Sequence, residues 1–121
     1  MSTRCLISAK ILGKVFTIYC HHDGYENHII PLLRDHYNTQ EKIEALIMMG
    51  NTSAIYETLD QCSPYADGSE NGEKYENNAP TITERFVLNP AYYFEYYWDG
   101  KEWYWSYMHS PIKQISEYKE D

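Results

Sequence analysis

The architecture of this chain depends most on the segment Tyr92-Tyr93-Phe94-Glu95-Tyr96-Tyr97-Trp98-Asp99-Gly100-Lys101-Glu102-Trp103-Tyr104-Trp105-Ser106-Tyr107. Two aromatic runs flank an Asp-Gly pair, which is the strongest short-range signal for a β-hairpin. A two-residue turn at this pair sets residues of the two strands opposite one another as follows: Trp98 and Lys101, Tyr96 and Trp103, Phe94 and Trp105, Tyr92 and Tyr107.

Side-chain alternation divides this hairpin into two faces. One face is almost wholly aromatic, and we predict that it packs on helices. The other face mixes Tyr with Glu, and its candidate contact residues are Tyr93, Glu95, Tyr97, Glu102 and Tyr104. Tyr offers contact area and a hydrogen bond at a low entropy cost, which favours a binding surface there. Packing within the sheet surface is the alternative.

Size and composition set the broad class. The 121 residues suit a single domain, 1–121, and 43% hydrophobic residues allow a real core. The net charge of −8 argues against a protein that grips nucleic acid by its phosphates. No apolar run is long enough to span a membrane, no secretory signal is evident, and three cysteines do not suggest a disulfide framework. We therefore expect a soluble, cytoplasmic protein.

A second hairpin is predicted near the start of the chain, with strands over residues 4–10 and 15–21. A two-residue loop at Leu12-Gly13 pairs Ile7 with Ile18 and Cys5 with Cys20. The apolar faces of the two strands then coincide, whereas a slip of one residue would expose one of them to water.

The remaining elements are short. We predict a helix from Pro31 to Tyr37, a helix capped by Asn38 and ended by Gly50, and a further helical turn up to Leu59. A third strand follows over residues 81–88, and a last helix spans residues 112–119. The predicted class is α+β: a small antiparallel sheet of two hairpins plus one strand, packed on two or three short helices.

Residues 60–80 are rich in acidic and helix-breaking residues, and we predict a long mobile loop. Its candidate binding residues are Asp67, Glu70, Glu73 and Glu76. Carboxylates in such a loop would steer the protein toward a basic partner.

Several chemical groups follow the second strand, in the motif loop His21, His22, Asp23 and Tyr25. The simplest interpretation is a structural corner, in which the Asp-Gly pair turns the chain. A metal site using His21 or His22, Asp23 and His28 is an alternative, although the spacing matches no standard zinc motif. A nucleophilic Cys20 beside a histidine is another, although Cys20 shares the apolar face of its strand.

The first half of the chain resembles a family of short uncharacterised proteins encoded on phages, prophages and conjugative elements of Gram-positive bacteria. The resemblance covers residues 1–55 and centres on Tyr19-Cys20-His21-His22-Asp23-Gly24-Tyr25, a Tyr-Cys-His-x-Asp-Gly-Tyr motif. It implies a mobile-element context, in which small acidic proteins often inhibit host defence enzymes. It implies no activity, and His22 stands where the family more often has an aromatic residue.

The sequence is compatible with three functions. The first is a non-catalytic binding protein that inhibits a host defence or nucleic-acid-handling protein with a basic surface, either as a monomer or as a homodimer, with no cofactor and no direct nucleic-acid contact. The second is a small-ligand protein, for example a nucleotide sponge. That function requires cations to converge on one pocket, and the candidates are Arg4, Lys10, Lys14, Arg34, Arg85 and Lys101. The third is a metal-dependent enzyme using the His21–Asp23 cluster.

Overall fold

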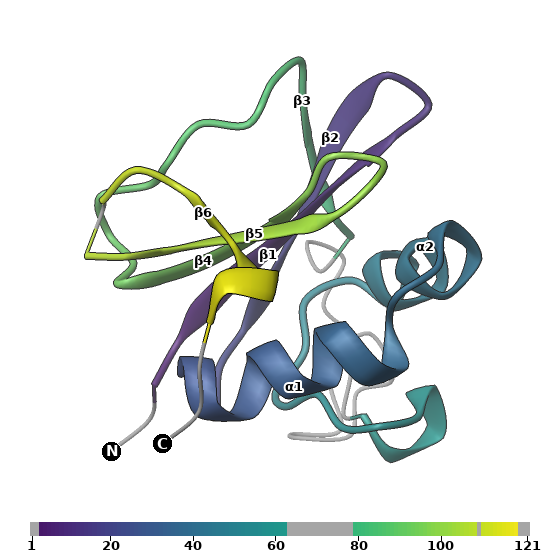
Figure 1. The fold of residues 1–121 in the computed structure, drawn as a ribbon. Helices are drawn as coiled ribbons and strands as arrows, with labels where there is room; N and C mark the ends of the chain where they lie inside the picture. Colours follow the sequence, from purple (N-terminus) through teal and green to yellow (C-terminus); the bar gives the residue numbers. More distant parts are fainter. Residues whose placement is uncertain (1–2, 63–78, 109, 119–121) are drawn as a thin grey trace.

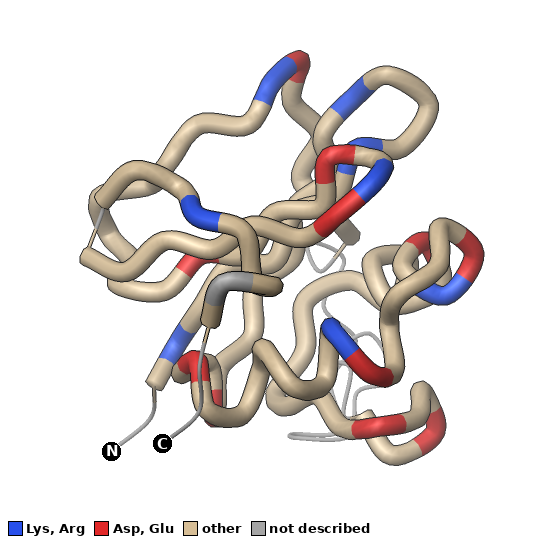
Figure 2. Tube along the Cα trace, in the orientation of Figure 1, with Lys and Arg blue, Asp and Glu red and all other residues tan. Residues whose placement is uncertain are grey.

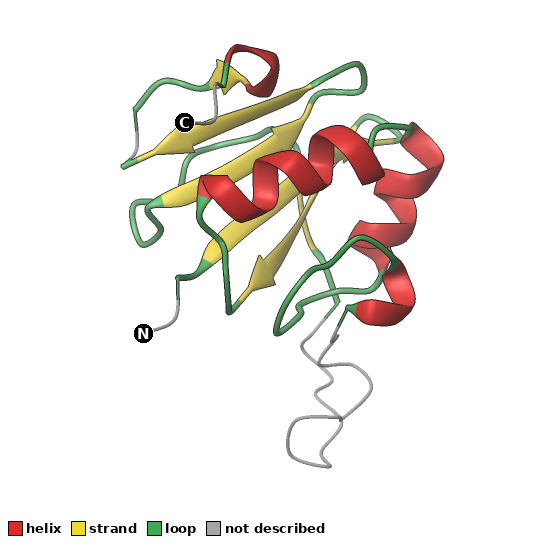
Figure 3. Ribbon diagram, turned by 60° about the horizontal axis from the view of Figure 1, so that its bottom comes forward, coloured by secondary structure: helices red, strands yellow, loops and turns green. Residues whose placement is uncertain are grey.

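The computed structural model describes residues 3–62, 79–108 and 110–118, and it has an α+β fold with a six-stranded mixed sheet and two helices (Figure 1). The sheet order is β3-β2-β1-β4-β5-β6. Its strands are β1 (Cys5–Ile11), β2 (Lys14–Cys20), β3 (Thr81–Thr83), β4 (Phe94–Trp98), β5 (Trp103–Tyr107) and β6 (Lys113–Gln114). The helices are α1 (Glu26–His36) and α2 (Gln40–Met48), with short 3-10 turns η1 (Leu59–Gln61) and η4 (Ile115–Glu117). Both α-helices cover one face of the sheet (Figure 3).

The first hairpin has the predicted register. Ile7 faces Ile18 and Cys5 faces Cys20, around a loop at Leu12 and Gly13. Both loop residues have positive φ, at 51° and 80°, which matches the twist of a tight two-residue hairpin turn.

The aromatic hairpin forms as β4 and β5, but its predicted register is wrong by two residues. Trp98 faces Trp103, and Tyr96 faces Trp105. The loop spans four residues because the Asp99 carboxylate accepts hydrogen bonds from the backbone N–H groups of Lys101 and Glu102, at 2.8 and 2.9 Å. A shift of two residues leaves each side chain on the predicted face, since the side-chain period of a strand is two.

The prediction of a purely antiparallel sheet is wrong. β4 lies beside β1 and runs parallel to it, with Cys5 facing Phe94 and Ala9 facing Trp98. This pairing joins the two hairpins into one sheet and makes β1 a central strand. The sheet has six strands where five were predicted, because β6 extends it beyond β5, while the predicted third strand is β3 at the edge beyond β2.

The predicted helices need two corrections. Helix α1 begins at Glu26, five residues before Pro31, because buried Ile29, Ile30 and other apolar residues of one face anchor it and offset the missing proline N–H. Helix α2 is capped by Thr39, whose hydroxyl accepts from the Lys42 N–H at 3.3 Å, and Asn38 is not the cap. Gly50 follows the helix with a φ of 83°, as expected of a C-terminal glycine.

Three peripheral segments also differ from prediction. Residues 52–58 form no helix. Thr52 makes a parallel bridge with Cys20, and the 3-10 turn η1 begins only after this segment, at Leu59. The third strand is limited to Thr81–Thr83, and residues 112–119 contain β6 and η4 in place of a helix.

The core lies between the sheet and the helices. Tyr96, Trp98 and Trp103 are buried there with the apolar side chains of β1, β2, α1 and α2, as predicted for the aromatic face. Each ring also has a polar partner in the helical layer: Tyr96 Oη donates to the Gly24 carbonyl at 2.8 Å, Trp98 Nε1 to Gln40 Oε1 at 2.7 Å and Trp103 Nε1 to the Tyr37 carbonyl at 2.8 Å. These bonds fix the aromatic hairpin relative to the helices.

Within the described ranges, no helix has the length and apolar character needed to cross a membrane.

Candidate functional site

The face of the sheet opposite the helices carries a pocket lined by residues of β1, β2 and the segment that follows β3. Residues 84–92, here called the crossing segment, leave β3 and pass over this outer face to reach β4 (Figure 1). A pocket of about 730 Å³ lies between this segment and the strands. Its floor comes from Leu6, Ser8, Val15, Thr17 and Tyr19 on β1 and β2, and its walls include Arg4, Asn51, Glu84, Arg85, Phe86 and Tyr92.

A ring stack and a pair of hydrogen bonds tie the crossing segment to β4, in addition to the ion pair between Glu84 and Lys14 of β2. The Phe86 ring stacks on Tyr97, with centroids 4.4 Å apart and planes 11° apart. The Glu95 carboxylate accepts from the Asn89 backbone N–H at 3.0 and 2.9 Å. Because Glu95 is only 2% exposed, the expectation that it lies on an open surface is wrong, and its observed partner is the crossing segment.

The other predicted contact residues of the hairpin occupy different environments. Tyr93 is 62% exposed and Tyr97 is half-buried under Phe86. Tyr104 Oη donates to Glu102 Oε1 at 3.0 Å, and this bond raises the pKa of Tyr104 above its ordinary value. Gln114 Nε2 donates to the same oxygen, so this corner of the surface is already cross-linked to β6. The five residues therefore do not form one continuous open Tyr/Glu surface.

The ionisable groups of the pocket are unequally paired. Glu84 accepts an ion pair from Lys14 Nζ at 2.7 Å, and Glu95 has the Asn89 N–H. Arg4 lies over the Tyr92 ring at 5.8 Å from its centroid. Neither Arg4 nor Arg85 makes an ion pair with any residue in the described ranges.

The small-ligand hypothesis requires six candidate cations to converge on one pocket, and only some of them do. Of the six candidates, Arg4 and Arg85 line this pocket and Lys14 pairs with its rim residue Glu84, whereas Lys10, Arg34 and Lys101 do not line it. Thr17, Phe86 and Tyr92 also belong to the pocket, and their roles were not predicted. Tyr92 was expected on the aromatic face that packs on the helices, and this prediction is wrong, because Tyr92 precedes β4 and lies beside Tyr19 in the pocket of the opposite face. The path of the crossing segment decides these roles, and no local pattern predicts it.

The motif loop forms a structural corner. The N–H groups of His21 and His22 donate to the carbonyls of Thr52 and Ser53, at 3.1 and 2.8 Å. His21 Nδ1 hydrogen-bonds the Tyr19 hydroxyl, and Asp23 has a positive φ of 57° where the chain turns. These bonds tie the end of β2 to the segment after α2.

Gly24 explains why the corner is tight. A Cβ added there would lie 2.7 Å from Cys5 Cβ and 2.8 Å from the Thr3 carbonyl oxygen, which no real side chain accommodates. The Gly24 N–H also donates to the Thr3 carbonyl at 2.7 Å. The motif therefore docks the start of α1 against the start of β1.

The motif loop does not bring together the side chains that a metal site or a nucleophilic Cys20 would need. His28 Nε2 hydrogen-bonds the Ile55 carbonyl at 2.9 Å, and neither His21 nor His22 takes part in this bond. No group of three His, Cys, Asp or Glu side chains suited to a metal ion occurs in the parts of the chain that the structure describes. Cys20 is buried and its thiol donates to the His22 carbonyl at 3.3 Å, which opposes the exposed thiolate that a nucleophile needs.

Acidic groups outnumber basic groups on the helical side. Among the described residues 21–62, seven are acidic and two are basic. In the sequence, residues 21–80 contain eleven acidic against three basic residues, and the rest of the chain has seven of each. Figure 2 shows mainly acidic positions around α2 and η1, and acidic and basic positions interspersed over the sheet. The predicted binding residues Asp67, Glu70, Glu73 and Glu76 belong to the acidic part of the sequence but lie outside the described residues.

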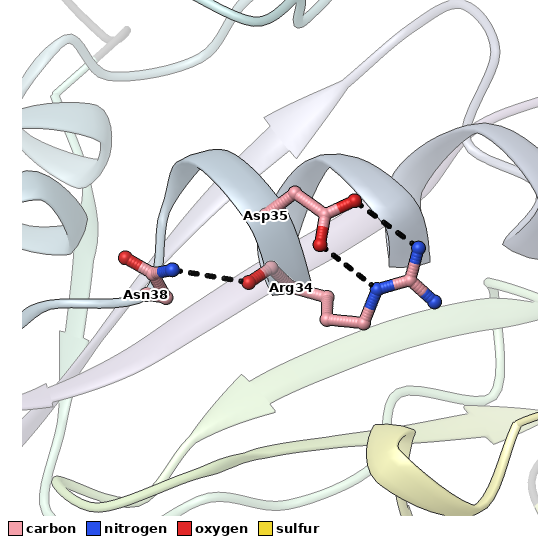
Figure 4. Close-up of polar contacts among 3 residues, drawn as sticks. All are labelled: Arg34, Asp35 and Asn38. Carbon is pink, nitrogen blue, oxygen red and sulfur yellow. Dashed lines mark hydrogen bonds and ion pairs between the residues drawn. The ribbon is translucent and has the colours of Figure 1, made fainter.

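One basic group of this side is already engaged. Arg34 Nε and a terminal guanidinium nitrogen donate to the two oxygens of Asp35, at 3.0 and 3.1 Å, and Asn38 Nδ2 donates to the Arg34 carbonyl at 3.2 Å (Figure 4). The bond from Arg34 holds the pKa of Asp35 below its ordinary value. The charge of Arg34 therefore neutralises that of Asp35, and the net charge of the helical side comes from its other carboxylates.

A second hollow lies on this acidic side. A groove of about 700 Å³ runs between α2 and residues 57–59. Tyr37, Ala45 and Leu59 give it apolar lining. Glu41 and Glu57 contribute two carboxylates, against the one ammonium group of Lys42, and His36 and two threonines complete the lining.

Comparison with known proteins found no match: no family model, no curated protein and no solved structure aligned significantly with the chain.

Proposed function

We propose that this protein is a non-catalytic binding protein that engages a basic protein surface through its acidic helical side. The observation that carries the proposal is the groove between α2 and residues 57–59, where apolar side chains lie beside the carboxylates of Glu41 and Glu57. Apolar lining supplies contact area, and carboxylates favour Lys or Arg side chains of a partner.

The distribution of charge supports the same surface. Because the described residues 21–62 carry seven acidic against two basic side chains, the field of this side attracts a basic partner. Such steering raises the association rate and specifies orientation more than it adds affinity.

The class of partner follows from this chemistry. Proteins that handle nucleic acid hold phosphates with Lys and Arg, so their clefts are basic surfaces that carboxylates can occupy. Together with the resemblance to mobile-element proteins, this favours a host defence or nucleic-acid-handling protein of the cytoplasm as the target of inhibition. Asp67, Glu70, Glu73 and Glu76 add further carboxylates to the chain and stay candidate contact residues for such a partner.

The test compares a double variant, Glu41→Gln with Glu57→Gln, against the control Glu84→Gln, which removes a carboxylate on the sheet side. Host proteins are captured from lysate at about 0.1 M salt, identified, purified and titrated with all three proteins. We expect the affinity of the wild type to fall steeply toward about 0.5 M salt, the double variant to bind at least about tenfold more weakly at low salt, and the control to match the wild type. Equal binding by the double variant, or affinity that does not change with salt, would overturn the proposal.

A further inference from the structure

We propose that the pocket under the crossing segment binds a small organic anion that carries a flat ring, the chemistry of nucleoside phosphates and of aromatic carboxylates. This site lies on the sheet face opposite the helices and does not depend on the partner proposed above. Its volume of about 730 Å³ falls within the range of about 300–1,000 Å³ typical of small-molecule sites.

The preference for an anion follows from the pairing of charges around the pocket. Both of its carboxylates have partners, Glu84 in the ion pair with Lys14 and Glu95 in its bonds with the Asn89 N–H. Arg4 and Arg85 line the pocket without an ion pair to any described residue. The three cations Arg4, Arg85 and Lys14 and the two carboxylates of Glu84 and Glu95 together leave one positive charge in excess. A guanidinium can bind a phosphate or a carboxylate through two parallel N–H groups.

The global negative charge does not oppose this assignment. The whole excess of acidic residues lies in residues 21–80, whereas the segments that supply the strands and the crossing segment are balanced. Among the lining residues, Asn51 alone comes from that acidic part, and it is uncharged. An anion approaching the outer face therefore does not meet the acidic excess of residues 21–62.

The preference for a ring follows from the apolar and aromatic lining. Leu6, Val15, Phe86 and Tyr92 provide flat or apolar surface, and Tyr19 lies edge-on to Tyr92 with centroids 6.0 Å apart. Aromatic side chains bind ring-bearing ligands with little loss of conformational entropy. The hydroxyl groups of Ser8 and Thr17, 2.7 Å apart on the floor, can exchange hydrogen bonds with polar edges of such a ligand.

The pocket also has a means of admitting a ligand. Its roof is one segment held by the Phe86–Tyr97 stack and the Asn89–Glu95 bonds, and Arg85 and Val87 of this segment are exposed. A roof with few buried contacts opens at a low free-energy cost compared with the core.

The experiment titrates the purified full-length chain by calorimetry with four probes: adenosine monophosphate, indole-3-carboxylate, adenosine and inorganic phosphate. We expect at least one of the two ring-bearing anions to bind at least about tenfold more tightly than adenosine and phosphate, a difference of about 1.4 kcal/mol. Tighter binding of the nucleotide identifies a phosphate source, and tighter binding of the indole acid identifies a carboxylate source. Adenosine or phosphate binding as tightly as the ring-bearing anions would overturn the proposal, as would no binding of either anion at millimolar concentration.

Matched variants locate the site. Arg85→Gln and Arg4→Gln each should weaken the binding of the preferred anion at least about tenfold, and Arg34→Gln, on the helical side, should leave it unchanged. Because Arg85 makes no ion pair with a described residue, its variant should keep the wild-type melting temperature without ligand. Anion affinity that survives both pocket variants would refute the assignment, whatever the outcome of the partner-binding test.

Discussion

The two faces of the sheet use the same aromatic-rich strands and close in different ways. On the inner face, Tyr96, Trp98 and Trp103 are buried, and their polar atoms bond to groups of the helical layer. On the outer face, one crossing segment is held by the Phe86–Tyr97 stack and by the Asn89–Glu95 bonds, and a pocket remains beneath it. The comparison teaches that alternation assigns a side chain to a face, while the cover over that face decides what the side chain does.

Energetic consequences should follow the same division. A residue under the helices loses a full set of packing contacts when it is truncated, whereas a residue under the crossing segment loses a partial set. The inner face should therefore carry most of the free energy of unfolding, and the outer face should be the locally less stable layer.

The strongest test of this division uses two tyrosines of the same ribbon. Tyr96→Ala removes a fully buried ring and its bond to the Gly24 carbonyl, and we expect a loss of about 4 kcal/mol in the free energy of unfolding, measured by urea denaturation. Tyr93→Ala, at a ring that is 62% exposed, should change it by less than about 0.5 kcal/mol.

If Tyr96→Ala does not fold, Tyr96→Phe replaces it in the comparison. This variant keeps the ring and removes the hydroxyl, and it should cost about 1–2 kcal/mol because the buried Gly24 carbonyl loses its donor. Similar costs at positions 93 and 96 would contradict the division between the faces.

A smaller effect is expected at the cover of the outer face. Phe86→Ala removes the stack on Tyr97 and should lower the free energy of unfolding by about 1.5 kcal/mol, the sum of a partial burial and an aromatic pair. Hydrogen exchange should accelerate at the amides of residues 84–92 more than at those of β1. The neighbouring Val87→Ala, at an exposed side chain, is the control and should change neither measurement appreciably. Equal acceleration in β1 would mean that the two layers open together.

Local patterns in the sequence were sufficient for the hairpins and their faces. The coincidence of apolar faces predicted the pairing of Ile7 with Ile18, and the Asp99-Gly100 pair located the second hairpin. The register of that hairpin was missed because the Asp99 side chain satisfies two backbone donors and opens the loop to four residues. Because the register is shifted by two residues, an even number, the side chains of β4 and β5 stay on their predicted faces, and Tyr96, Trp98 and Trp103 are buried as predicted.

Contacts between distant segments were beyond the sequence. Nothing local distinguishes β1 as the parallel neighbour of β4, since the two strands are separated by the helices and by β3. The crossing segment was assigned partly to a longer strand, and its cover over Glu95 and Tyr97 removed those residues from the predicted contact surface. The candidate pocket could not be found for the same reason, although two of its cations, Arg4 and Arg85, were among the candidates.

The smallest expected effect concerns the loop that sets the register of the outer and inner faces alike. Burial acts to raise the pKa of Asp99, but the hydrogen bonds donated by the N–H groups of Glu102 and Lys101 outweigh it and hold the pKa below its ordinary value. Asp99→Ala should therefore cost about 1 kcal/mol at neutral pH, with Lys101→Ala as the nearly neutral control.

The pH dependence has a defined sign. A carboxyl whose folded pKa is lowered contributes its full stabilisation above its unfolded pKa of about 3.9 and loses it as the pH falls through the lower folded value. The difference between wild type and Asp99→Ala, measured by urea denaturation, should thus be constant from neutral pH to about pH 5 and shrink below about pH 4. A difference that persists undiminished at the lowest pH at which both proteins fold would show that the loop is held by its backbone conformation and not by the Asp99 charge. In that case the four-residue loop would have to be attributed to Gly100, whose φ is 104°.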